Sequence, residues 1–141
     1  MRFWDSSALV PLVFDEPASV EMRRLAAEDH QTVIWGFSSV ELLSALARLE
    51  RSSQSLEDLL GGVRRDALEL ARRCRQVTQV DAVRQRAERL VGVHALTAAD
   101  ALQLAAALVA AREQPEALAF VTLDKVLARA ARLEGFRVFG V

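Results

Sequence analysis

Short runs of β-branched and aromatic residues alternate with longer amphipathic segments along this chain, and this alternation limits the folds open to it. The runs that we predict as strands cover residues 3–4, 32–35, 77–80, 119–122 and 136–139. No Asn-Gly or Asp-Gly turn joins two of them as a hairpin. Strands separated by helical segments are typical of a parallel sheet with helices on both faces.

Helical segments fill most of the chain between these runs. Most of them start at Ser, Thr or Asp, which cap helices well. We predict helices from residue 6 to about 16, over 20–29, from 38 past 49, over 55–75, from 81 past 91, over 97–112 and over 124–134. Neither a linker nor an internal repeat interrupts the pattern, so we expect residues 1–141 to form a single α/β domain.

Composition excludes several kinds of site and partner. Cys74 is the only cysteine, so no intrachain disulfide is possible and a cytoplasmic location is expected. One cysteine with two well-separated histidines, His30 and His94, does not supply the usual zinc ligands. The longest nearly apolar run, 101–111, is too short to cross a bilayer, so we expect no membrane partner. The net charge of −1 argues against tight binding to nucleic acid by charge alone.

Acidic residues occupy the junctions where function is expected in a parallel sheet, beyond the carboxyl ends of the strands. Asp5 and Asp124 follow predicted strands, and Glu41 and Asp100 lie in the first turns of predicted helices. Four converging carboxylates without a cation would repel one another and raise some of their pKa values. A bound Mg²⁺ or Mn²⁺ would relieve this repulsion and could support the hydrolysis of a phosphodiester.

Helix capping is an alternative explanation for each of these acids. Ser38-x-x-Glu41 has the spacing of a capping box, and Thr97-x-x-Asp100 approximates it with Asp in place of Glu. Asp5 and Asp124 could act as N-caps. Spacing along the sequence does not show whether positions 5, 41, 100 and 124 meet in space, so both explanations stay open at this level.

Other site types are less consistent with the sequence. It contains neither a P-loop nor a G-x-G-x-x-G motif. Ser6 and Ser7 lack the nucleophile elbow of a serine hydrolase, and His94 is better explained as a capping or surface residue than as a base. Arg48 and Arg51, beyond Glu41 on the same predicted helix, are the better candidates for contact with a phosphate.

Four ordered segments resemble the PIN-domain family, and specifically the VapC-type ribonuclease toxins of bacterial toxin–antitoxin pairs. They read FWDSSALV around Asp5, SSVELLSALAR around Glu41, LTAADALQLAAA around Asp100 and FVTLDKVLARAA around Asp124. The closing Gly-Phe-Arg-Val from Gly135 also matches. Length, order and spacing agree along the whole chain.

The resemblance implies a three-layer α/β/α sandwich with a mostly parallel central sheet, whose four acids line one Mg²⁺-dependent endoribonuclease site. Asp5 and Asp100 would be the principal metal ligands, and Asp124 would complete the site directly or through water. Glu41 would act through a water or help orient the nucleophile. The hydroxyls of Ser7 and Thr122 would hold the metal ligands in place without binding the metal themselves.

The resemblance also implies partners: an RNA substrate, a cognate antitoxin that inserts a segment into the acidic groove, and a second copy of the chain. Many relatives carry Arg three residues before the third acid, where this chain has Thr97, so no phosphate contact is carried over to that position. Two alternatives remain. One is a PIN-like binding module without catalysis. The other is a Mg²⁺-binding phospho-receiver domain, which the serines after Asp5 and the position of Lys125 disfavour.

Overall fold

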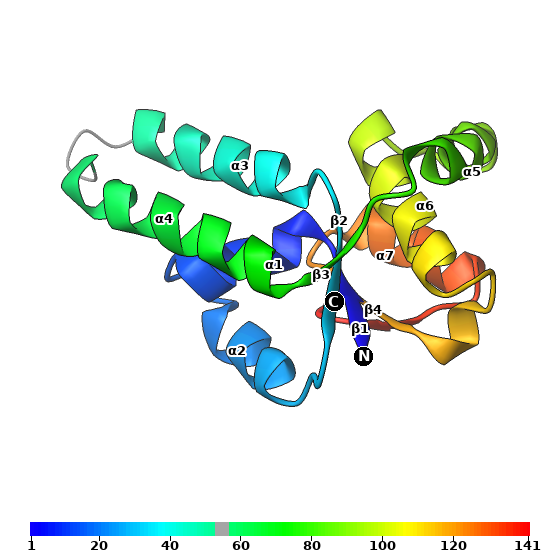
Figure 1. The fold of residues 1–141 in the computed structure, drawn as a ribbon, viewed down its shortest axis with the longest axis horizontal. Coiled ribbons are helices and arrows are strands. Elements are labelled where there is room, and N and C mark those ends of the chain that lie inside the picture. The colour runs from blue at the N-terminus through cyan, green and yellow to red at the C-terminus, as the bar shows by residue number, and fades with distance from the viewer. Residues whose placement is uncertain (53–56) are drawn as a thin grey trace.

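The computed structural model describes residues 1–52 and 57–141 and shows one five-stranded sheet in which every neighbouring pair of strands is parallel (Figure 1). The strand order is β3-β2-β1-β4-β5. The strands are β1 (Arg2–Trp4), β2 (Thr32–Trp35), β3 (Arg75–Val77), β4 (Ala119–Val121) and β5 (Arg137–Phe139). The predicted parallel α/β fold is confirmed.

Helices connect the strands and cover both faces of the sheet. Within the described residues they are α1 (Ser6–Val13), α2 (Ser19–Ala27), α3 (Ser38–Ser52), α4 (Glu57–Arg73), α5 (Val80–Val93), α6 (Ala98–Ala110) and α7 (Lys125–Leu133), with a short 3₁₀ turn at Pro115–Ala117. In Figure 1 helices α1 to α4 lie on one side of the sheet and α5 to α7 on the other. This is the predicted three-layer arrangement.

Two cores hold the layers together because successive strand residues point to opposite faces. Phe3, Val33 and Phe120 pack under α5, α6 and α7. Trp4 and Val121, their neighbours in the strands, pack under α1 to α4. Strands buried on both faces read as continuous apolar runs, which is why the central strands could be recognised in the sequence.

The sequence-based boundaries of the third strand are wrong. It was predicted over 77–80 but covers Arg75–Val77, and α5 begins at Val80. This strand lies at the edge of the sheet, and Arg75 and Gln76 are exposed, so the usual apolar signal is confined to Val77. The first helix also ends earlier than predicted, at Val13. The predicted start at Ser55 lies outside the described residues.

Gly135 adopts a φ of 98° between α7 and β5, where a Cβ would lie 2.9 Å from Pro115, so glycine suits this turn. No helix among residues 1–52 and 57–141 is long and apolar enough to cross a membrane.

Candidate functional site

The four acids chosen from the sequence lie just after central strands or in the first turns of helices. Asp5 follows β1 directly and is the N-cap of α1. Glu41 lies in the first turn of α3, which begins soon after β2 ends. Asp100 lies in the first turn of α6 on the other side of the sheet. The topology therefore brings two helix N-termini toward the end of the strand that carries Asp5.

Asp5 is the most enclosed of these acids, with only 3% of its surface exposed. Its Oδ2 accepts hydrogen bonds from the Ser7 backbone N–H at 3.2 Å, from Thr122 Oγ1 at 2.9 Å and from the Ser7 hydroxyl. The Ser7 hydroxyl in turn accepts the backbone N–H of Leu123 at 3.0 Å. Asp5 is thus more than a helix cap, because side chains from the start of α1 and from the end of β4 hold it in place.

Ser6 links Asp5 to Glu41. Its hydroxyl lies 2.8 Å from Glu41 Oε2 and 3.4 Å from Asp5 Oδ1. The sequence indicated Ser6 only as an unsuitable hydrolase nucleophile and missed this bridging position. Its place next to Asp5 was the one available signal, since nothing in the sequence relates residue 6 to residue 41.

Gln103 is a second residue that sequence reasoning missed. It is completely buried, and its Nε2 donates to Ser38 Oγ at 3.1 Å. It also lowers the pKa of Glu41, although burial of that carboxylate outweighs this effect. A buried amide within the alanine-rich α6, three residues after Asp100, was a usable signal. The predicted capping box between Ser38 and Glu41 is wrong: Ser38 turns to Gln103, and Glu41 reaches Ser6.

Asp100 is held by the residue that caps its helix. Thr97 Oγ1 accepts the backbone N–H of Asp100 at 3.2 Å and donates to Asp100 Oδ2 at 2.7 Å. The predicted cap at Thr97 is confirmed. Asp100 and Glu41 line one hollow between α1, α3 and α6, whose walls also include Ser6, Ser7, Val10, Val40, Ser44, Ala45, Arg48 and Ala99.

The carboxylates influence one another electrostatically. The pKa of Asp5 is raised, mainly by burial, and the charge of Asp100 adds to the rise. The pKa of Glu41 is raised for the same reason, with further contributions from the charges of Asp5 and Asp100. Charging Asp5 and Glu41 in these surroundings is unfavourable unless a cation approaches them.

The donor set fits a hard divalent cation, although the site is open. Among residues 1–52 and 57–141, no three acidic, His or Cys side chains lie close enough together to enclose a metal ion. Mg²⁺ does not need such an enclosure, because it keeps several waters and binds through one or two carboxylates. Asp5 Oδ1 has a single long hydrogen bond from Ser6, and Asp100 is bound by Thr97 through Oδ2.

Asp124 lies apart from this hollow. It is the N-cap of α7, where Oδ1 accepts the backbone N–H of Leu127 at 2.8 Å. Its own backbone N–H donates to Thr122 Oγ1 at 3.0 Å, and Thr122 contacts Asp5. Capping explains the orientation of Asp124, and its connection to Asp5 runs through Thr122.

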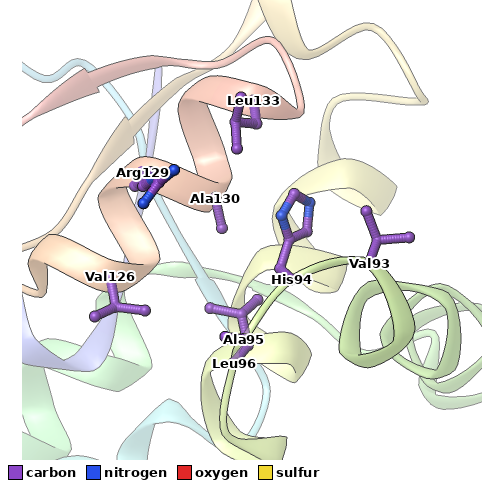
Figure 2. A pocket seen from close by; sticks show the side chains of 8 residues that line it. All are labelled: Val93, His94, Ala95, Leu96, Val126, Arg129, Ala130 and Leu133. Atoms are coloured by element: carbon purple, nitrogen blue, oxygen red, sulfur yellow. The ribbon is translucent and has the colours of Figure 1, made fainter.

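A separate hollow lies between α7 and the connection from α5 to α6 (Figure 2). His94 and Arg129 lie on its opposite walls, and its described lining contains no acidic side chain. His94 follows the last residue of α5 as its C-cap, and its Nε2 lies 2.7 Å from Glu134 Oε1. This agrees with the prediction that His94 is a capping residue, and the hollow lacks the groups for metal binding.

Comparison with known proteins agrees with this geometry. A family model described as PIN domain matches residues 2–133. A crystal structure of FitAcB from Neisseria gonorrhoeae superposes with a TM-score of 0.59 at 16% sequence identity, covering 99% of this chain and 97% of that chain. At this identity the likeness shows a shared fold. The search of curated proteins finds no match.

Proposed function

Because the chain belongs to the PIN-domain family, we propose that it is a Mg²⁺-dependent endoribonuclease and the toxin of a VapBC-type toxin–antitoxin pair. PIN domains are usually nucleases, and the four acidic motifs support retention of that chemistry. The observation that supports the proposal is that Glu41 and Asp100 line one hollow, and that Ser6 on the wall of this hollow links Glu41 to the buried Asp5.

Each acid has a separate role in this proposal. Asp5 and Asp100 would hold the cation, for which Mn²⁺ is an alternative to Mg²⁺. Such a cation would supply Lewis-acid chemistry, lowering the pKa of a bound water and compensating charge on the scissile phosphate. Glu41, held by Ser6, would orient the attacking water. Asp124, whose backbone N–H donates to Thr122, would complete the metal site directly or through water. Ser7 and Thr122 keep Asp5 in place.

We further propose that the protein acts in the cytoplasm as a homodimer and is inhibited by a cognate antitoxin. These partners follow from the family resemblance of the motifs rather than from a contact described above. An antitoxin segment that fills the hollow beside Asp100 would block both the cation and the substrate.

Cleavage of single-stranded RNA by the purified chain tests the proposal. We expect cleavage with Mg²⁺, no cleavage with EDTA, and recovery when excess Mg²⁺ is added. Asp5→Asn and Asp100→Asn should each lower the rate at least a hundredfold, and the exposed Asp66→Asn on α4 should not change it. Equal cleavage by wild type and both site variants would contradict the proposal.

One observation favours a second candidate, a PIN-like binding module without catalysis. The described acids do not form a ready enclosure for a cation. Such a module would show no cleavage under any metal condition and would bind neither Mg²⁺ nor Mn²⁺ in the millimolar range.

A further inference from the structure

Arg48 extends the acidic hollow with a positive charge. It lies on α3 seven residues beyond Glu41, or about 10 Å along the helix axis, on the same face. Its side chain lines the hollow that contains Glu41 and Asp100. It also lines an adjoining hollow, together with Ser7, Val10, Glu16, Ala45, Leu49, Ser52 and Leu123. Arg48 therefore stands where the two hollows meet.

The charge of Arg48 is not neutralised by an ion pair within residues 1–52 and 57–141. Its only described side-chain contact is a long hydrogen bond, 3.5 Å, to the Ser44 hydroxyl. Arginines on other helix faces behave differently: Arg24 and Arg84 each pair with acids three and four residues away. The residues one helical turn from Arg48 on α3 are Ser44, Ala45, Arg51 and Ser52. None of them is acidic, so α3 offers Arg48 no ion-pair partner at these positions.

Arg48 is also the only basic residue among the described residues that line the acidic hollow. A polyanion that enters this hollow is repelled by the carboxylates of Glu41 and Asp100 unless a cation compensates them. A guanidinium binds phosphate through two parallel hydrogen bonds, and this interaction is strong because both groups are charged. The side chain is thus placed to bind a phosphate beside the one at the acids.

We infer that Arg48 binds a backbone phosphate adjacent to the scissile one, and that the RNA strand runs along α3 from Glu41 toward Ser52. The inference rests on the proposed ribonuclease function and assigns its substrate path. It also selects between the two arginines that the sequence offered, because Arg51 lies on α3 but lines neither hollow. Arg48 is a substrate-binding residue in this account, and the acids carry the chemistry.

Binding of a short single-stranded RNA to Arg48→Gln, with Arg51→Gln as the matched control, tests the inference. Both are measured in an Asp100→Asn background, which prevents cleavage during the titration. We expect Arg48→Gln to weaken binding about tenfold or more and to reduce the slope of log affinity against log salt by about 0.7. Arg51→Gln should stay within about twofold of the background. Both side chains are exposed, so unchanged thermal unfolding midpoints would verify the fold.

A cleavage assay of the same substitutions without Asp100→Asn separates the possible failures. If the wild-type chain cleaves RNA and Arg48→Gln binds and cleaves as it does, the inference is overturned and the proposed function stands. If Arg48→Gln binds RNA normally but loses affinity for an acidic peptide, Arg48 serves a protein partner and the inference is again overturned. If the wild-type chain neither binds nor cleaves RNA, the proposed function fails, and the inference fails with it.

Discussion

Asp5 places a carboxylate in the protein interior, where an uncompensated charge is unfavourable. Hydrogen bonds from Ser7 and Thr122 favour the charged form, yet burial outweighs them and the pKa remains raised. A helix cap alone needs no such burial, since caps function well at the surface. We therefore interpret the surroundings of Asp5 as an environment for a cation rather than for capping alone.

Ser6 contacts two of the acids, Asp5 and Glu41, so we expect its loss to lower activity. Ser6→Ala removes the hydroxyl that donates to Glu41 and lies within 3.4 Å of Asp5. Loss of a group that orients a metal ligand lowers metal affinity or activity by about 10–100-fold. We expect a decrease of that size in the RNA cleavage rate.

Ser44→Ala is the control for Ser6→Ala. Ser44 lines the same hollow but has only the 3.5 Å hydrogen bond from Arg48. We expect its cleavage rate to stay within a few-fold of wild type. An equal loss of rate in the two variants would show that the bridging position of Ser6 is not what matters.

The residues that sequence reasoning found and missed differ in chemical type. Asp5, Glu41 and Asp100 were proposed because acids at helix starts have a recognisable pattern, and Glu41 and Asp100 line the same hollow. Ser6 and Gln103 were missed because a hydroxyl or an amide carries meaning only through its spatial neighbours. Thr97 binds Oδ2 of Asp100. The choice of this oxygen depends on side-chain conformation, for which the sequence has no signal.

At the scale of elements, an ionic cluster joins α5 to the end of α7. Arg89 donates to both carboxylate oxygens of Glu134, at 2.6 and 3.2 Å, and His94 lies 2.7 Å from the same carboxylate. These contacts lower the pKa of Glu134, with the hydrogen bonds from Arg89 as the largest cause. The cluster fixes the C-terminal ends of two helices that pack on the same face of the sheet.

Glu134→Gln tests this cluster through the pH dependence of stability. A lowered pKa means that the charged carboxylate favours the folded state at pH values above its unfolded value of 4.5. This contribution is fully present at pH 7 and disappears as pH falls through the lower pKa of the folded state. We expect the substitution to reduce the free energy of unfolding by about 1–2 kcal/mol at pH 7 and by much less below pH 4.

Urea denaturation at both pH values measures this difference, and Glu88→Gln is the control. Glu88 pairs with Arg84 on the exposed face of α5, so its loss should matter much less at either pH. A Glu134→Gln effect as small as that of Glu88→Gln, or one that grows as pH falls, would contradict the assignment.

The elements also show where sequence patterns lose information. The buried strands β1, β2 and β4 were predicted because their residues are apolar on both faces. The edge strand β3 was misplaced because its exposed Arg75 and Gln76 do not differ from loop residues. The buried strands could therefore be located from their burial pattern, whereas the exposed edge strand could not be located from intrinsic strand propensity.

At the scale of the whole molecule, the sheet separates two helical layers and brings their N-terminal ends to one edge. The alternation of strands and helices predicted the parallel sheet and its two covered faces. It did not predict the strand order β3-β2-β1-β4-β5, because any of several right-handed crossovers satisfies the same pattern. That order puts β1 at the centre and so places Asp5 between the layers that carry Glu41 and Asp100.

The net charge of −1 is the sum of acidic and basic side chains that lie in different parts of the molecule. Acids gather in the hollow, whereas Arg48 stands beside them and other arginines pair on outer helix faces. The near-neutral total therefore excludes binding to RNA by a general basic surface and is compatible with a local path. A divalent cation is the group that would make that path attractive to a polyanion.

Calorimetric titration of the purified chain with Mn²⁺ tests most directly whether the acids form one metal site. We predict binding in the millimolar range or tighter, weakened at least tenfold by Asp5→Asn and by Asp100→Asn and unchanged by Asp66→Asn. No binding by the wild-type chain, or equal binding by all four proteins, would contradict the account.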